Sequence, residues 1–175
     1  MPLVREIEYQ GYVFRSKAEA KWAFFLDALE IEYFYEPDTF TLTTAAGKGV
    51  NYLPDFLLSE QNVFVEVKLE PKPKPEECWK CWALAVETGM DVLLLFEPIG
   101  KIDYNGFRYK GGTGEVEPLQ RLTTCPFCNT FGFTKLGLVG DLPCECSNRC
   151  ADLANDRASR IKTAIDKTRK ERFGA

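Results

Sequence analysis

The 175-residue sequence has no histidine, no glycine-rich phosphate loop and no long apolar run. Without an imidazole to act as base, catalysis by a serine or cysteine nucleophile is disfavoured. The Gly-Lys-Gly stretch at 47–49 falls far short of a P-loop, which argues against phosphoryl transfer on small nucleotides. No apolar stretch approaches the ~18 residues that span a bilayer, and residues 1–6 lack the apolar region of a secretory signal. We therefore expect a cytoplasmic protein with no membrane contact.

Positive charge is scarce overall but concentrated near one end. The net charge is -4, yet residues 156–172 hold seven Lys/Arg and three acids, a local +4 that leaves -8 for the rest. A basic segment on an acidic body suits contact with a phosphate backbone, although a solvated helix face explains it equally well. The candidate DNA-binding residues of this segment are Arg157, Arg160, Lys167 and Arg169.

Cysteine is the unusual residue type that is present. Five of the seven cysteines lie between 125 and 150, and in an intracellular protein this clustering favours metal over disulfides. A Cys-x2-Cys pair followed about 16 residues later by further cysteines has the spacing of a zinc ribbon, whose four thiolates close a structural site. The predicted ligands are Cys125, Cys128, Cys144 and Cys146, with Cys150 as a substitute for either of the last two. Cys78 and Cys81 share the spacing, but their helical, tryptophan-rich context favours core packing.

Hydrophobic periodicity predicts an α/β protein with a mixed sheet. Ser16 is a good N-cap for the first helix, and Gly89 ends the second. Asn105-Gly106 predicts a hairpin turn, and the glycine-rich residues 111–118 predict a linker. The expected elements are a helix over 14–31, three strands within 32–58, a strand over 62–69, a helix over 76–89, a strand over 91–99, a hairpin over 102–109 and a helix over 153–173.

Acidic residues near two neighbouring strands indicate a metal-dependent site. Asp55 follows Pro54 near the end of one strand, and Glu66 lies on the next, so the two converge if these strands pair. Lys68 projects from the same face as Glu66 because strand side chains alternate. Carboxylates that hold Mg²⁺ beside a lysine can generate hydroxide and neutralise the charge of phosphodiester hydrolysis. The Val67 carbonyl could add an oxygen ligand.

The combination of Pro54-Asp55 with Glu66-Val67-Lys68 resembles the signature of the PD-(D/E)XK nuclease superfamily. The expected α-β-β-β-α-β order also resembles the core of that superfamily, which is restriction-endonuclease-like. Residues 14–69 are similar to small phage- and plasmid-type members, and the resemblance covers roughly residues 10–98.

The resemblance implies a role for each matching residue. Asp55 and Glu66 would bind Mg²⁺ or Mn²⁺, and Lys68 would orient the attacking water or stabilise developing charge. Glu19 matches an acid that members often carry on the first helix, although Ser16 and Glu19 also form a capping box, in which Glu19 would bond to the Ser16 N–H. Lys80 could face the same cleft, and with Lys17 it completes the candidate DNA contacts.

The sequence therefore predicts a Mg²⁺-dependent deoxyribonuclease that processes phage or mobile-element DNA in recombination, repair, or junction or flap cleavage. A junction-cleaving enzyme would be expected to form a homodimer. We expect a nuclease-like core over 1–118, and a zinc ribbon with a basic helix over 119–175. The alternative is an inactive scaffold that binds nucleic acid or protein through the zinc ribbon.

Overall fold

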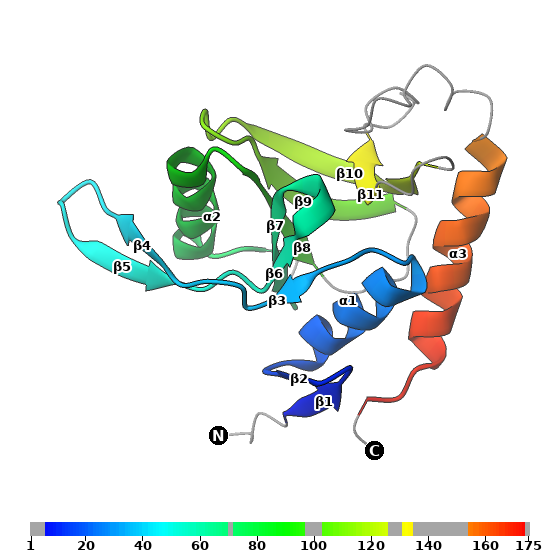
Figure 1. Cartoon of the computed structure of the whole chain (residues 1–175). Helices are drawn as coiled ribbons and strands as arrows, with labels where there is room; N and C mark the ends of the chain where they lie inside the picture. The colour runs from blue at the N-terminus through cyan, green and yellow to red at the C-terminus, as the bar shows by residue number, and fades with distance from the viewer. Residues whose placement is uncertain (1–5, 70–71, 97–102, 126–130, 135–153, 174–175) are drawn as a thin grey trace. The chain divides into compact units, whose positions relative to one another are not determined.

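The computed structural model describes residues 6–69, 72–96, 103–125, 131–134 and 154–173. The described residues form a mixed α/β fold with a mixed sheet and three α-helices, as the hydrophobic periodicity predicts (Figure 1). The chain divides into two compact units. The first comprises residues 1–32, 98–104 and 120–175, and the second comprises residues 33–97 and 105–119. The predicted boundary between 118 and 119 stays a prediction.

Most of the large sheet belongs to the second unit. Its strands are β3 (Phe34–Tyr35), β6 (Phe56–Leu58), β7 (Val63–Lys68), β8 (Asp91–Phe96), β9 (Asp103–Tyr109) and the start of β10 (Val116–Thr124). β6 is antiparallel to β7, whereas β7 and β8 are parallel. Parallel neighbours need a crossover connection, and helix α2 (Pro75–Thr88) supplies it. The hydrogen-bonded strand order is β11-β10-β9-β8-β7-β6-β3, where β11 is Phe131–Thr134.

A separate hairpin of β4 (Phe40–Thr43) and β5 (Gly49–Tyr52) contacts α2 in the second unit (Figure 1). Leu42 is fully buried, and the Thr43 N–H donates to Glu87 Oε1 at 3.1 Å. An apolar cluster joins the hairpin, α2 and the sheet; its buried members include Leu42, Tyr52, Phe64, Cys81, Leu84, Val92, Leu94 and Tyr109. The hairpin therefore covers part of the core beside strand β7.

The first unit contains β1 (Ile7–Tyr9), β2 (Tyr12–Phe14), α1 (Lys17–Ala28) and α3 (Ala154–Lys170). α1 and α3 contact each other, and Ile161, Ala164, Ile165 and Thr168 form the buried face of α3. Tyr9, Phe24 and Phe173 form an aromatic cluster, with ring centroids 5.7 to 6.0 Å apart. The buried positions of α3 recur with the period of a helix, and the side chains of 154 and 158 lie outside the described residues.

Local signals set the helix ends. The Ser16 side chain accepts from the Glu19 N–H and begins α1, and Gly89 ends α2 with a φ of 71°. Glycine is the residue most often found in the left-handed conformation that ends a helix. The predicted helices over 76–89 and 153–173 are confirmed to within a few residues, and α1 is shorter than the predicted 14–31.

Two local predictions are wrong. Asn105-Gly106 does not turn the chain, because β9 continues through it and pairs Gly106 with Leu95 of β8. Residues 111–118 are not a linker either, since a tight turn closed by Lys110 and Glu115 leads directly into β10. In both places pairing with neighbouring strands overrides the local turn or linker signal.

Candidate metal-binding active site

The register of β6 and β7 brings the two predicted acids together. Phe56 pairs with Val65, Leu57 with Phe64 and Leu58 with Val63. Continued by one residue, this register sets Asp55 opposite Glu66 on the same face of the sheet. Both are almost fully buried, with 4% and 6% of their surface exposed. The sequence predicts that Asp55 and Glu66 lie close together if their two strands pair, and β6 and β7 are paired.

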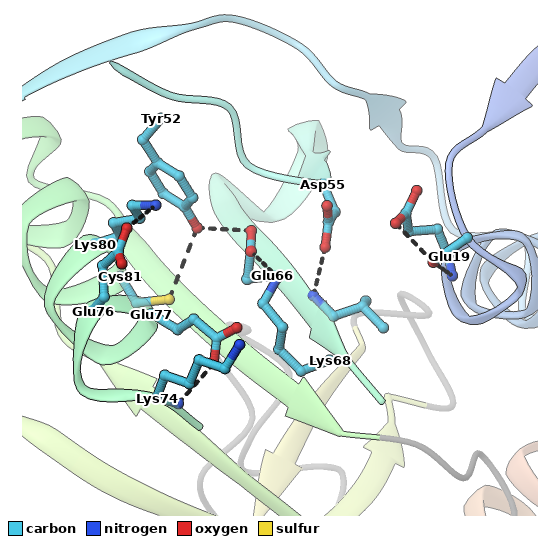
Figure 2. A network of polar contacts seen from close by, with 12 residues as sticks. Glu19, Tyr52, Asp55, Glu66, Lys68, Lys74, Glu76, Glu77, Lys80 and Cys81 are labelled. Atoms are coloured by element: carbon cyan, nitrogen blue, oxygen red, sulfur yellow. Dashed lines mark hydrogen bonds and ion pairs between the residues drawn. The ribbon is translucent and has the colours of Figure 1, made fainter. Parts of the chain in front are cut away.

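The Asp55 carboxylate bonds to the backbone of β7 beyond the last regular pair of the ladder. Its Oδ2 accepts from the Val67 N–H at 2.7 Å (Figure 2). Val67 thus contributes its N–H to the site, and the ligand role predicted for its carbonyl stays a prediction.

The two carboxylate oxygens of Glu66 meet two different donors. Oε1 is 2.5 Å from the Lys68 ammonium, and Oε2 accepts from the Tyr52 hydroxyl at 2.8 Å (Figure 2). Lys68 reaches Glu66 because residues two apart on a strand share a face. Glu66 is therefore a buried carboxylate whose orientation is fixed by one cation and one neutral donor.

Lys68 is held as a cation. Its burial acts to lower the pKa of the ammonium, but the charges of Glu66 and Asp55 and the bond to Glu66 outweigh burial and raise that pKa. At neutral pH the group is therefore fully protonated. A protonated lysine can orient a water or stabilise developing negative charge, but it cannot accept the proton of that water. This state fits the role that the family resemblance implies.

Tyr52 and Cys81 close the inner side of the site and remain neutral. Burial, followed by the nearby Cys81 and Glu66, raises the pKa of the Tyr52 hydroxyl. Burial also raises the pKa of the Cys81 thiol, which lies 3.8 Å from that hydroxyl. A neutral phenol keeps its proton for Glu66, and a fully buried neutral thiol is not a nucleophile.

The donor set suits a hard cation. Asp55 and Glu66 offer carboxylate oxygens, and Mg²⁺ is usually held by one or two carboxylates with water in its other positions. Among the described residues, no group of three or more His, Cys, Asp or Glu could hold a metal ion. A pair of carboxylates beside Lys68 therefore fits Mg²⁺ or Mn²⁺, and not an all-protein cage.

Glu19 belongs to the first unit, where it caps α1. Its Oε1 accepts from the Ser16 hydroxyl at 2.7 Å, and its Oε2 accepts from the Arg15 N–H at 3.1 Å. The capping interaction is present, but the backbone donor is the N–H of Arg15, one residue before the one that the sequence predicts. Both carboxylate oxygens of Glu19 therefore bind groups at the start of α1. An active-site role for Glu19 stays a prediction.

The predicted DNA contacts occupy different surroundings. Lys80 is bound to Glu76 on α2 at 2.7 Å, and Arg160 lies 3.8 Å from Glu30. Lys17, Lys167 and Arg169 are exposed, whereas the side chain of Arg157 lies outside the described residues. None of these positions is shown to contact DNA, so the binding role stays a prediction.

The predicted zinc ligands fall almost entirely outside the described residues. Cys125 is described and buried, whereas Cys128, Cys144, Cys146 and Cys150 are not described. The zinc ribbon therefore stays a prediction. Cys78 and Cys81 lie on α2, Cys81 is fully buried in the apolar cluster, and neither forms a disulfide, in agreement with the predicted packing role.

Sequence reasoning missed Tyr52 and did not indicate how deeply Glu66 is buried. Four consecutive residues, 64–67, are buried, so β7 is covered on both faces. Leu69, just after the end of the strand, is 63% exposed. The one sequence signal that could have indicated Tyr52 is its position three residues before Asp55.

No family model, curated protein or solved structure matches this chain. Within the part of the chain that the structure describes, no helix combines the length and apolar character needed to cross a bilayer.

Proposed function

We propose that the protein is a metal-dependent deoxyribonuclease that hydrolyses phosphodiester bonds. Its active-site residues are Asp55, Glu66 and Lys68. The observation that carries the proposal is the β6–β7 register, which, when continued by one residue, sets two buried carboxylates opposite each other beside a lysine. Burying two acids side by side is unfavourable, and packing alone gives no reason for it. A cation bound between them would offset that cost.

The order of elements supports the same proposal. Along the chain, α1, β3, β6, β7, α2 and β8 follow the α-β-β-β-α-β order, with the β4–β5 hairpin inserted after β3. We propose that this is a restriction-endonuclease-like core. The proposal places the reacting phosphate beside the end of β7, where Lys68 retains some exposure.

Each residue has a defined task in this proposal. Asp55 and Glu66 would hold Mg²⁺ or Mn²⁺, which lowers the pKa of a bound water and neutralises charge on the phosphate. Lys68, protonated at neutral pH, orients the attacking water or stabilises the charge that develops on the phosphate. Val67 fixes Asp55 through its N–H.

Basic side chains on α3 supply a second support. Lys162, Lys167, Arg169, Lys170 and Arg172 are exposed on or just after this helix. Such a face suits sequence-independent contact with the phosphate backbone of DNA. We propose that α3, together with a zinc ribbon, grips the substrate in phage or mobile-element DNA processing.

The test is cleavage of a panel of DNA substrates with Mg²⁺ and with Mn²⁺. The panel contains single strands, duplexes, flaps and four-way junctions. Asp55→Asn and Glu66→Gln should each lower the rate by about 10²-fold or more, as is usual when a group that stabilises the transition state is removed. Glu60→Gln is the matched control, because Glu60 is an exposed acid between the same two strands.

Titration with Mg²⁺ by calorimetry gives an independent readout. We expect binding heat in the wild type and in Glu60→Gln, and none in Glu66→Gln. Cleavage that survives in Asp55→Asn and Glu66→Gln would refute the mechanism. A wild type that neither binds Mg²⁺ nor cleaves would favour the alternative, a nuclease-like scaffold that binds nucleic acid or protein.

A further inference from the structure

Tyr52 contacts the proposed metal ligand Glu66 from outside the large sheet. It is the last residue of β5, in the hairpin that packs against α2, and its partner across the hairpin is Phe40. Only 6% of its surface is exposed. Its hydroxyl donates to Glu66 Oε2 at 2.8 Å, across 14 positions of sequence.

With this contact, the two carboxylate oxygens of Glu66 each bind a different donor. Lys68 holds Oε1 and Tyr52 holds Oε2, so the carboxylate plane cannot rotate without breaking one of the two bonds (Figure 2). Lys68 retains 28% side-chain exposure and belongs to the reacting end of the site. Tyr52 is buried and belongs to the core. The two donors therefore differ in kind: one is available to substrate, and the other is fixed.

The tyrosine hydroxyl is not needed to fill space. The ring lies in the apolar cluster with Phe64 and Cys81, and a phenylalanine ring would fill the same volume. A buried hydroxyl has to be hydrogen-bonded to offset its desolvation, and the stronger of its two contacts is the one with Glu66. The hydroxyl is thus explained by the carboxylate that it meets.

We propose that Tyr52 is a positioning residue that holds Glu66 in the orientation needed for metal binding. The proposal rests on the proposed nuclease function. Groups that hydrogen-bond to a ligating carboxylate fix its direction, and their loss typically costs about 10- to 100-fold in metal affinity or activity. The β4–β5 hairpin is then a support of the active site, and the Thr43–Glu87 bond attaches that support to α2.

The experiment compares two substitutions of the same kind. Tyr52→Phe removes one hydroxyl and keeps the ring. Tyr109→Phe makes the same change in the same apolar cluster, at a residue of β9 with 4% exposure. We expect Tyr52→Phe to weaken Mg²⁺ binding in calorimetry about 10- to 100-fold, and Tyr109→Phe to leave it unchanged.

A kinetic split separates positioning from a general loss of stability. Tyr52→Phe should raise the Mg²⁺ concentration for half-maximal cleavage more than it lowers the rate at saturating Mg²⁺. Tyr109→Phe should leave both quantities unchanged. Thermal unfolding of both variants checks that each is folded.

The outcomes distinguish this proposal from the one on which it rests. Equal Mg²⁺ affinity in the wild type and Tyr52→Phe would overturn the positioning role and leave the nuclease intact. Equal losses in Tyr52→Phe and Tyr109→Phe would also overturn it, because they would report core packing. A wild type with neither Mg²⁺ heat nor cleavage would refute the nuclease, and the positioning role with it.

Discussion

At the scale of single residues, the site depends on which donors the carboxylate oxygens of Asp55 and Glu66 bind. Asp55 binds a backbone N–H, and Glu66 binds a lysine and a tyrosine. Both acids are buried, so each depends on these hydrogen bonds and on Lys68 to offset the cost of its desolvation.

Three of the predicted site residues lie together, and the neighbour Tyr52 was missed for a physical reason. Asp55, Glu66 and Lys68 follow from local rules, since strand alternation and one antiparallel pairing are enough to group them. Tyr52 reaches Glu66 only because a separate hairpin folds onto α2. No periodic pattern encodes that contact. Contacts that depend on tertiary packing therefore cannot be predicted from local sequence patterns.

Tyr9 carries a prediction about alkaline stability. Burial raises the pKa of its hydroxyl from 10.0 to about 12, and Asp27 adds to the shift through a hydrogen bond. Because the folded pKa lies above the unfolded one, the stabilisation is complete below pH 10 and is lost as the pH rises through about 12. Tyr9→Phe should therefore lose less stability than the wild type between pH 9 and pH 11.5.

The measurement is the unfolding midpoint of both proteins at several pH values in that range. Tyr52 and Tyr109 are unchanged in both proteins, so the difference isolates Tyr9. Its ring contacts with Phe24 and Phe173 are available to phenylalanine as well. Parallel loss in the two proteins would show that Tyr9 does not titrate in this window.

At the scale of elements, the turn between β9 and β10 shows why a glycine-rich stretch need not be a linker. The Gly111 N–H donates to Asp91 Oδ1 at 2.8 Å, and the Gly112 N–H donates to the Ala85 carbonyl at 2.9 Å. The turn is therefore attached to both β8 and the end of α2. Asp91 also binds Arg108, which fixes the start of β8 against β9.

Two neighbouring glycines in this turn allow a matched test. A Cβ on Gly111 would lie 2.1 Å from the Gly89 carbonyl oxygen, so the backbone would have to move. A Cβ on Gly112 meets nothing within 4 Å, but its φ of +73° is strained for alanine. We expect Gly112→Ala to cost about 1 kcal/mol, and Gly111→Ala to cost about 2 to 3 kcal/mol.

Urea unfolding of the two variants and the wild type measures these costs. The same residue type is exchanged at adjacent positions, so differences in the unfolded state nearly cancel. Equal destabilisation would mean that the close approach of Gly111 to Gly89 is not a constraint on the fold.

Element boundaries were predictable where a cap is encoded and unpredictable where a partner strand decides. Ser16 and Gly89 mark helix ends through their own chemistry. Asn105-Gly106 carries an equally strong local signal for a turn, yet β8 beside it holds the chain extended. Seven-stranded pairing is a property of the assembled sheet, and no short stretch contains it.

At the scale of the whole molecule, the cysteine cluster predicts a metal content. We expect about one zinc per chain in the purified wild type, because four thiolates close one tetrahedral site. Cys128→Ser should lose the zinc. Cys78→Ser is the control, since Cys78 lies on α2 outside the cluster. Elemental analysis by mass spectrometry measures the content.

Removal of the zinc should also lower stability. Structural zinc contributes directly to folding, so a strong chelator is expected to lower the unfolding temperature of the wild type more than that of Cys128→Ser. Zinc that is missing from the wild type, or retained in full by Cys128→Ser, would contradict the predicted ligand set.

The contact between α1 and α3 joins two segments that are far apart along the chain. Ala28 and Ala154 are 126 positions apart, whereas β6, β7, α2 and β8 follow one another directly. Distant pairings close large loops and form late. On a ribosome, which releases the chain from its amino end, α1 would emerge well before its partner. α1 can therefore pack early against β1 and β2, whereas its contact with α3 forms only after most of the described residues have been made.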